Sequence, residues 1–300
     1  MKVTVVLNRD AGTLKSLDVE QTADEIAAVF RAHGHDADVE IASGDDVVAT
    51  IRQACSGAGV DAVIVGGGDG TVSAAAAAAA ECGVALGILP LGTMNYFARS
   101  LQIPLDLNAA AEALAGGIVA NADIATIDDR VFIHSIALGL HPAMVEEREK
   151  RDYGSRYGKM IGSLRAWLRV ARNLRPIRVT IAVEDSRVDR RTAGVVVSNN
   201  RFGEGHGPYA DSLEEGLLAV YVTRARGWFQ LARVTASVGL GTAANHPLVE
   251  AFQTQTAEID IGRRRVRATV DGELATLSGP LKIESLPGGL RVLRPREKAQ

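Results

Sequence analysis

AVIVGGGDGT, residues 62–71, is the stretch of sequence that decides the fold. Its first part, Ala62–Val65, is fully apolar, which is typical of a strand buried on both faces of a parallel sheet. The alanine-rich residues Ala74–Ala80 follow it and predict a helix. Glycines between a strand and a helix let the backbone approach a ligand, and the free N–H groups at the helix start favour phosphate oxygens. The sequence therefore predicts a phosphate-binding turn at Gly66–Gly68.

Asp69, Gly70 and Thr71 complete this turn. A carboxylate repels phosphate unless Mg²⁺ lies between them, so Asp69 predicts a cation together with the phosphate. The alternative is a tight turn capped by Asp69 or Thr71, but three consecutive glycines and an acid exceed what such a turn needs. The loop is neither a Walker A motif, which requires a lysine, nor the Gly-x-Gly-x-x-Gly dinucleotide fingerprint.

Working outward, the first 125 residues alternate short apolar runs with helical patterns, as in a parallel sheet with crossover helices. The predicted strands are Val3–Leu7, Ala37–Ile41, Ala62–Val65 and Val84–Leu89. The predicted helices are Ala23–Ala32, Val47–Cys55, Ala74–Ala80 and Asn108–Leu114. Residues 1–125 are therefore expected to form a Rossmann-like α/β nucleotide-binding domain.

The pattern changes near Ala125, where β-branched and alternating runs take over. The predicted strands are Val131–Ile136, Ile177–Val183, Ala193–Ser198, Leu217–Thr223, Ala257–Ile261, Val266–Val270 and Leu281–Ser285. Helical stretches interrupt them around Ile161–Leu174 and Trp228–Val238. We expect a mainly antiparallel β domain over residues 126–294, carrying substrate-binding and catalytic groups, and a polar tail over 295–300.

The composition is that of an ordinary globular protein, with 47% hydrophobic and 23% charged residues among 300. The formal net charge of −3 gives no signature of a nucleic-acid binder. Only two cysteines occur, which excludes a disulfide framework and favours the cytoplasm. No apolar run approaches the roughly 20 residues that span a bilayer, and the N-terminus lacks the plan of a signal peptide.

A second strand-to-turn element, Gly87–Arg99, contains Gly92, Thr93 and Asn95. With the first loop, it resembles the diacylglycerol kinase catalytic family, which pairs Gly-Gly-Asp-Gly-Thr with a downstream Gly-Thr-x-Asn-x-Phe-Ala-Arg. The resemblance implies ATP as the phosphoryl donor, Mg²⁺ as its counter-ion and a lipid hydroxyl as the acceptor. The implied nucleotide-binding residues are Asn8, Gly66, Gly67, Gly68, Asp69, Gly70, Thr71, Gly92, Thr93 and Asn95.

The resemblance extends to both ends of the chain. Asn8 and Gly12 match the end of the family's first strand, although the family's proline is missing, and Asp271-Gly272-Glu273 matches an Asp-Gly-Glu near the C-terminus. Taken alone, Asp-Gly predicts a hairpin turn. In the family pattern these acids face the nucleotide loop across an interdomain cleft. The resemblance makes Glu273 the general base, with Asp271 and Asp69 holding Mg²⁺ or orienting the phosphates.

Two departures from the family pattern concern single residues. Many relatives have Asn-Asp where this chain has Asn95-Tyr96, so a carboxylate is lost there. Glu215 replaces an Asp that, in some bacterial members, supports a structural Mg²⁺ with two nearby carbonyl groups. The corresponding metal positions here are Ser212, Glu215 and Leu217.

A basic stretch, Arg156–Arg178, contains seven basic residues and no acid. At helical spacing, Leu164, Trp167, Leu168, Ala171 and Leu174 share one face, with arginines beside it. Such a helix can lie on an anionic bilayer, which would place the protein at the inner face of the membrane. The alternative is a helix packed on the β domain with its arginines in solvent.

Two other functions remain open from the sequence. An NAD kinase shares the Gly-Gly-Asp-Gly loop, but its downstream Asn-x-Glu segment is absent here. A catalytically silent relative that binds nucleotide or lipid would need no general base. The sequence does not name the lipid, and an exposed sheet edge would allow a homodimer.

Overall fold

The computed structural model describes residues 1–44, 46–149, 165, 167–183 and 186–296, and their packing divides the chain into two compact units. The first unit comprises residues 1–124, 212–215 and the chain from Leu286 onward. The second comprises Ala125–Asp211 and Gly216–Ser285. Residues 212–215 and 286–294, expected in the second domain, thus pack in the first unit. Residues 297–300 of the expected tail lie outside the described chain.

The first unit is built on a parallel sheet with the strand order β2-β1-β3-β4. Its strands are β1 (Lys2–Asn8), β2 (Asp36–Ala42), β3 (Ala62–Gly67) and β4 (Ala85–Pro90). β3 and β4 are buried along their whole length, as the apolar runs predict. The strand order reverses between β1 and β3, and ligands of open α/β sheets bind beside the carboxyl ends of strands at such a reversal. Asn8 and Gly67 are those ends.

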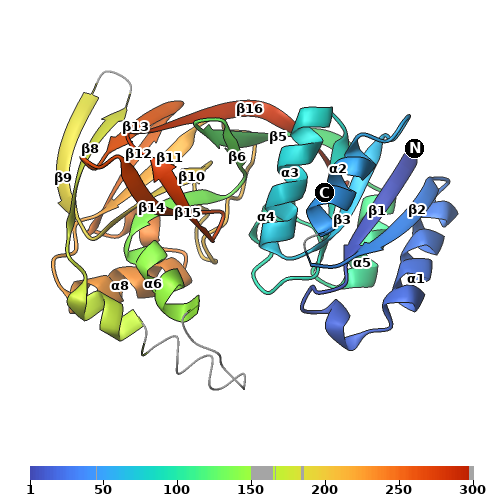
Figure 1. Ribbon diagram of the computed structural model, residues 1–300, viewed down its shortest axis with the longest axis horizontal. Coiled ribbons are helices and arrows are strands. Elements are labelled where there is room, and N and C mark those ends of the chain that lie inside the picture. Colours follow the sequence, from blue (N-terminus) through green and yellow to red (C-terminus); the bar gives the residue numbers. More distant parts are fainter. Residues whose placement is uncertain (45, 150–164, 166, 184–185, 297–300) are drawn as a thin grey trace. The chain divides into compact units, whose positions relative to one another are not determined.

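Helices connect these strands on both faces of the sheet. Their bounds are α1 (Val19–Ala32), α2 (Asp46–Cys55), α3 (Asp69–Cys82), α4 (Tyr96–Ser100) and α5 (Leu107–Ala115), with a 3₁₀ turn at Leu14–Ser16. α1 packs on α5 and α2 packs on α3, and right-handed crossovers place the two pairs on opposite faces (Figure 1). Asp18 and Asp106 cap α1 and α5 through their side chains, whereas α3 has no side-chain cap.

The second unit is a β sandwich, and most of its strands are antiparallel, as predicted. One sheet has the order β12-β11-β10-β7-β14-β15, and the other contains β13, β8 and β9 with the first part of β16. The strands are β5 (Ile118–Ile127), β6 (Arg130–Phe132), β7 (Ser135–Gly139), β8 (Ile177–Val183), β9 (Ser186–Thr192), β10 (Gly194–Asn199), β11 (Leu218–Thr223), β12 (Val249–Thr254), β13 (Thr256–Asp260), β14 (Arg265–Val270), β15 (Glu273–Ser278) and β16 (Leu281–Arg294).

Buried apolar side chains from both sheets form the core of the sandwich. Val179 and Ile181 of β8 meet Val220 of β11 in one continuous cluster, and each is at most 2% exposed. Inward-facing positions alternate with exposed ones over the first four residues of β14 and the first five of β16, which is the pattern of a sheet with one solvated face. Burial of this alternating set fixes the strand register, because a slip of one residue would turn every apolar side chain to solvent.

A layer of helices covers one part of the second unit. It contains α6 (Leu140–Glu149), α8 (Trp228–Gly239), a 3₁₀ turn at Ala243–Asn245 and the helical residues 167–173. Trp167 and Ala171 are 8% and 6% exposed and pack against Leu231 of α8. The indole N–H of Trp167 donates to the Thr235 hydroxyl at 3.2 Å.

This packing bears on the expected membrane face within Arg156–Arg178. Residues 156–164 and 166 of that stretch lie outside the described residues. In the rest of it, the apolar side chains Trp167, Leu168, Ala171 and Leu174 contact the protein, and Arg165, Arg169 and Arg172 are exposed. That arrangement matches the alternative of a helix packed on the β-rich unit. Among the described residues, no helix is both long enough and apolar enough to cross a membrane.

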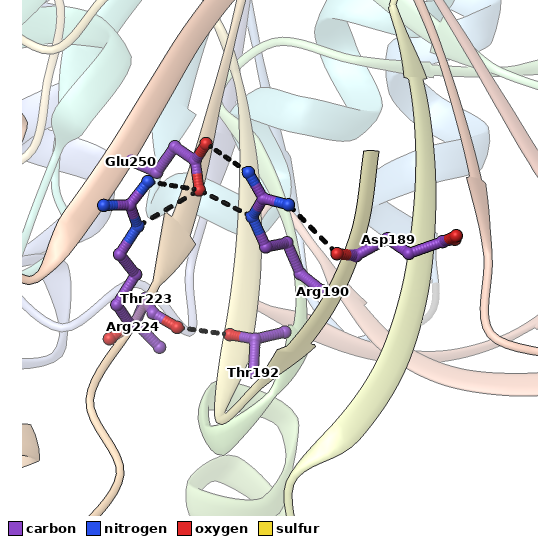
Figure 2. A network of polar contacts seen from close by, with 6 residues as sticks. All are labelled: Asp189, Arg190, Thr192, Thr223, Arg224 and Glu250. Carbon is purple, nitrogen blue, oxygen red and sulfur yellow. Dashed lines mark hydrogen bonds and ion pairs between the residues drawn. The ribbon is translucent and has the colours of Figure 1, made fainter. Parts of the chain in front are cut away.

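A polar network joins the outermost strands of the two sheets of the sandwich (Figure 2). Arg190 on β9 donates to the Glu250 carboxylate of β12 from Nε at 2.9 Å and from Nη2 at 2.8 Å. Arg224 donates to the same carboxylate at 3.2 Å, and the Thr192 hydroxyl donates to the Thr223 carbonyl at 2.7 Å. Bidentate pairing of this kind fixes geometry as well as charge, so the network holds this edge of the sandwich together.

β16 belongs to both units. Its first residues pair with β13, where Thr256 faces Glu284, and its later part pairs in parallel with β4, where Val292 faces Leu86. Asp123 anchors that later part, because its carboxylate accepts the Gly288 N–H at 2.8 Å and its own N–H donates to the Leu213 carbonyl at 2.7 Å. These bonds explain why two later segments of the chain pack in the first unit.

Candidate active site

The glycine loop lies at the carboxyl end of β3, where the sequence predicts it. Gly68 is the N-cap residue of α3 and has an extended conformation, so no side chain covers the first N–H groups of that helix. Two of the glycines pack closely against side chains. A Cβ on Gly67 would lie 2.6 Å from the Cβ of Thr71, and one on Gly66 would lie 2.6 Å from Leu7. A Cβ on Gly68 would meet only the Cα of Gly92, at 3.6 Å.

The second loop, Gly92–Asn95, lies directly against the first. A Cβ on Gly92 would approach the Cα of Gly68 to 2.7 Å, so the close contact of the two backbones requires a glycine at residue 92. Asn95 has a positive φ of 51°, and its side chain accepts the Gly92 N–H and donates to the Gly92 carbonyl, each at 2.9 Å. The Asn95 side chain therefore stabilises its own loop, because both its oxygen and its NH₂ group form hydrogen bonds within the loop.

Asp69 connects the two loops. Its carboxylate accepts the N–H of Asn95 at 3.0 Å and that of Tyr96 at 2.8 Å, one on each oxygen. An anion placed at the start of α4 in this way is favourable. Each carboxylate oxygen has two lone pairs, so each retains one for a further partner. The donor set is compatible with a cation-bound phosphate, and the assignment of Asp69 to Mg²⁺ stays a prediction.

Asn8 completes the edge of the parallel sheet. Its Nδ2 donates to the Thr71 hydroxyl at 3.1 Å, and its Oδ1 accepts the Asp10 N–H at 3.0 Å. The structure thus brings together Asn8, Asp69, Thr71 and Asn95, with the glycines between them, at the ends of β1, β3 and β4. Thr93 is exposed beside them. Uncapped amides, small residues and one acid suit a polyphosphate group.

Tyr96 stands where many relatives have an acid. It is half-buried, and burial raises the pKa of its phenol, with the nearby Asp69 charge adding to the increase and Arg99 opposing it. The side chain is therefore a neutral hydrogen-bonding group at physiological pH. The backbone N–H of Tyr96 is one of the two donors to Asp69, and no sequence pattern indicates this contact.

In the second unit, Asp271 and Gly272 form the turn of the β14–β15 hairpin. Val270 pairs with Glu273 across it, and the φ angles of Asp271 and Gly272 are 49° and 89°. Two successive positive φ angles define the type I′ turn, for which Asp-Gly is a preferred pair. The hairpin reading of this dipeptide is confirmed, and it coexists with a second role of the Asp271 side chain.

The Asp271 carboxylate is buried, at 8% exposure, and accepts three backbone N–H groups. The donors are Ile133 at 3.0 Å and His134 at 2.9 Å, which separate β6 from β7, and Ser135 at 3.0 Å, which begins β7. The single strand predicted over Val131–Ile136 is therefore wrong, since the chain turns at Ile133 and His134 to present these amides. No pattern in the sequence marks them as partners of Asp271.

Glu273 follows two residues later, and its side chain lies in different surroundings from that of Asp271. Its side chain is exposed and makes no hydrogen bond or ion pair with any described residue. A carboxylate held on a rigid hairpin and free of partners can accept a proton, which is what a general base must do.

At two of the three positions expected to hold a structural Mg²⁺, an oxygen atom already accepts a backbone hydrogen bond. The Ser212 hydroxyl accepts the Glu214 N–H at 3.2 Å, and the Leu217 carbonyl accepts the Asn200 N–H at 3.1 Å. Glu215 is exposed. In the described part of the chain, no group of three or more His, Cys, Asp or Glu side chains has a metal-binding arrangement. One carboxylate and two carbonyls remain a possible oxygen set for Mg²⁺, which stays a prediction.

Comparison with known proteins gives two matching domains. The diacylglycerol kinase catalytic domain matches residues 2–127, and the YegS C-terminal NAD kinase beta sandwich-like domain matches residues 152–294. A diacylglycerol kinase of Mycobacterium tuberculosis is 29% identical over 288 residues, which cover 90% of this chain and 91% of that protein. The protein named "Probable lipid kinase YegS-like" of Enterobacter sp. (strain 638) is 30% identical over 257 residues, 83% of each chain.

Two further comparisons concern length and fold. The chain spans 60% of the length of the uncharacterized protein sll0036 of Synechocystis sp., with which it is 26% identical. A crystal structure of a diacylglycerol kinase from Bacillus anthracis str. Sterne has a TM-score of 0.73 and 21% identity, and the match covers 98% of this chain and 96% of that one. At that identity the likeness concerns the fold.

Proposed function

The chain belongs to the diacylglycerol kinase catalytic family, and on that premise we propose that it transfers the γ-phosphoryl group of ATP, with Mg²⁺, to the hydroxyl of a diacylglycerol-like lipid. The single observation that carries this proposal is the contrast between two kinds of site residue. The loops of the first unit offer uncapped amides to phosphate, and the hairpin of the second unit offers an unpartnered carboxylate.

The first unit supplies the groups that would hold the nucleotide. The N–H groups at the start of α3 have no side-chain cap, and a helix N-terminus carries a partial positive charge that favours phosphate. Because no lysine lies in the loop, charge neutralisation would depend on these amides and on Mg²⁺. Asp69 has one lone pair left on each oxygen, which is sufficient for a direct or water-mediated contact with the ion.

The second unit supplies the proton acceptor. A lipid hydroxyl has a very high pKa, so its proton must be accepted as the bond to phosphorus forms. In this step the hydroxyl oxygen bonds to the γ-phosphorus, the bond to the β–γ bridging oxygen breaks, and the proton passes to the Glu273 carboxylate. The products are a phosphorylated lipid and ADP. Three backbone amides hold the Asp271 carboxylate in place on the same hairpin, and its expected role toward Mg²⁺ or the phosphates stays a prediction.

The proposal is tested by incubating the purified chain with γ-labelled ATP, Mg²⁺ and detergent-dispersed diacylglycerol, phosphatidylglycerol, sphingosine or NAD. Label is expected on a lipid, and its identity names the acceptor. Label on NAD would replace the proposal with an NAD kinase activity. ATP binding without labelling of any acceptor would favour a catalytically silent relative.

The role of Glu273 is tested with Glu273→Gln, which preserves the shape of the side chain and removes its basicity. Turnover is expected to fall roughly 100- to 10,000-fold, the range for loss of general-base catalysis. ATP affinity, measured by calorimetry, should stay within a factor of two of the parent. Glu258→Gln is the matched control, since Glu258 is another exposed glutamate of the second unit. Unchanged turnover in Glu273→Gln would refute the base assignment.

A further inference from the structure

The largest exposed apolar side chains of the described chain gather on α8. Leu240 is 69% exposed and Phe229 is 64% exposed, the two highest values among large apolar residues, and Trp228 is 43% exposed. Leu240 directly follows the last helical residue of α8, and Trp228 and Phe229 begin the helix. The proposed reaction uses none of these side chains. Exposed aromatic and aliphatic groups gathered on one element mark an interaction surface.

These residues form one stripe along the helix. Phe229, Arg233, Ala236 and Leu240 follow each other at intervals of four, three and four residues, which places them on one helical face about 16 Å long. Trp228 flanks this stripe and meets Phe229 edge-to-face, with ring centroids 5.8 Å apart. We call this set the α8 outer face. The opposite side of α8, with Leu231 and Val234, packs into the unit's helical layer.

Basic side chains lie along the α8 outer face, and Glu204, the acid near its end at Leu240, pairs with Arg201 at 3.0 Å. The Arg172 guanidinium lies over the Trp228 ring, 5.3 Å from its centroid, and Arg226 and Arg233 are exposed on α8 and just before it. The sequence contains no acid between Glu215 and Glu250. Of the acids on neighbouring α6, Glu147 pairs with Arg169 and Glu146 pairs with Arg267. Arg172, Arg226 and Arg233 form no ion pair with any described residue.

We propose that the α8 outer face docks the protein on an anionic phospholipid bilayer, with Trp228, Phe229 and Leu240 entering the boundary between headgroups and acyl chains. A helix that lies in this boundary needs a row of apolar side chains and basic residues at headgroup level, and α8 supplies both. Tryptophan favours the same depth, since its ring is apolar and its N–H is polar. A second copy of this chain fits less well, because a symmetric contact would bring the three unpaired arginines against one another.

This surface differs from the expected membrane face on residues 156–178. There the tryptophan, Trp167, is buried against α8, so the helix bearing it supports the docking helix from behind. Arg172 belongs both to the expected membrane face and to the surroundings of the α8 outer face, because it extends from that helix over Trp228.

Vesicle binding without ATP tests the proposal independently of any kinase activity. The full chain is mixed with vesicles of phosphatidylcholine alone or with added phosphatidylserine, which supplies negative charge without a glycerol hydroxyl. Binding is expected only with phosphatidylserine, with a blue shift of tryptophan emission. The chain has two tryptophans, and the buried Trp167 should not respond, so Trp228→Phe should remove the shift. A shift that persists in Trp228→Phe would overturn the proposal.

Matched variants separate the two components of docking. Phe229→Ser and Leu240→Ser should each lower the vesicle partition coefficient roughly tenfold, whereas Leu105→Ser, which removes a 43% exposed leucine of the first unit, should not change it. Arg226→Gln and Arg233→Gln should each lower it about fivefold, and Arg264→Gln, in an exposed basic run elsewhere in the unit, should not. Circular dichroism and the melting temperature confirm folding of each variant.

Two further outcomes would overturn the proposal. One is equal binding of the parent and of the Phe229→Ser/Leu240→Ser double variant. The other is an absence of binding of the parent to vesicles that contain phosphatidylserine. If light scattering then shows a dimer that the double variant dissociates, the α8 outer face is an interface between copies of this chain.

Discussion

The carboxylates of Asp271 and Glu273 lie two residues apart on one hairpin, and one accepts three backbone N–H groups while the other accepts none. The buried carboxylate fixes the hairpin to the segment between β6 and β7. The exposed one is held by that hairpin without being engaged. The two acids of this motif thus lie in different surroundings, and only Glu273 has no side-chain partner among the described residues.

Asp271→Asn should be the more destabilising of the two amide substitutions at this hairpin. Asparagine tolerates a positive φ, so the turn is not strained, but its NH₂ group cannot accept a bond and would face an N–H donor. We expect a loss of about 2–3 kcal/mol in the free energy of unfolding, measured by urea denaturation. Glu273→Gln should change it by less than about 0.5 kcal/mol. Equal stability of the two variants would contradict the structural role of Asp271.

Two glycine-to-alanine substitutions should separate packing from ligand binding in the phosphate loops. An alanine Cβ at Gly92 would lie 2.7 Å from the backbone at Gly68, so Gly92→Ala should cost about 1–3 kcal/mol of stability. At Gly68 the nearest atom is 3.6 Å away and φ is −87°, so Gly68→Ala should fold normally.

The added methyl group at residue 68 would nevertheless stand beside the first amides of α3. We therefore expect Gly68→Ala to weaken ATP binding roughly tenfold or more, measured by calorimetry, at an unchanged melting temperature. Parent-like ATP affinity in this variant would argue against phosphate binding at the start of α3.

Tyr96 should make the protein less stable at high pH. Its folded-state pKa is raised above that of an exposed tyrosine, chiefly by burial and then by Asp69. The folded chain therefore binds this proton more tightly, and stability is lost as pH rises from about 10 through the raised pKa. Tyr96→Phe should remove that part of the alkaline loss. In an absorbance titration, the parent should show one more tyrosine ionising above the ordinary value of about 10 than Tyr96→Phe does.

The Glu250 network should make the sandwich sensitive to acid. Hydrogen bonds from Arg190 lower the pKa of Glu250, so the folded chain binds this proton less tightly than the unfolded chain. The stabilisation is present above the ordinary glutamate pKa of about 4.3 and is lost as pH falls through the lower folded-state value. Glu250→Gln should lower stability at pH 7 and flatten its decline below about pH 4.3. A parallel decline in parent and variant would show that the network contributes nothing.

Much of the first unit follows from local sequence. Ala62–Val65 is apolar enough to require burial on both faces, and the glycines and Asp69 that follow it end the strand and begin α3. The parallel order then brings Asn8 to the same edge of the sheet without further information. The sequence does not reveal which contacts require the glycines. Gly67 leaves room for the Thr71 side chain, and Gly92 leaves room for the backbone at Gly68.

The second unit was less predictable where distant segments determine local structure. The amides that bind Asp271 come from residues 136 to 138 positions away, and nothing in Val131–Ile136 indicates that the strand must break for them. α6 was missed because Pro142 and a row of charges hide its pattern. The apolar stripe around Trp167 was read correctly as a helix face, but periodicity alone cannot tell whether protein or lipid covers such a face.

The division of β16 between the units has a consequence for biosynthesis. The later part of β16 that pairs with Leu86 of β4 leaves the ribosome about two hundred residues after its partner strand. Folding during translation generally proceeds domain by domain from the N-terminus, yet here the half that is made first must wait for residues made near the end. Neither half corresponds to one uninterrupted stretch of the gene, so the two halves cannot be exchanged between relatives as simple cassettes.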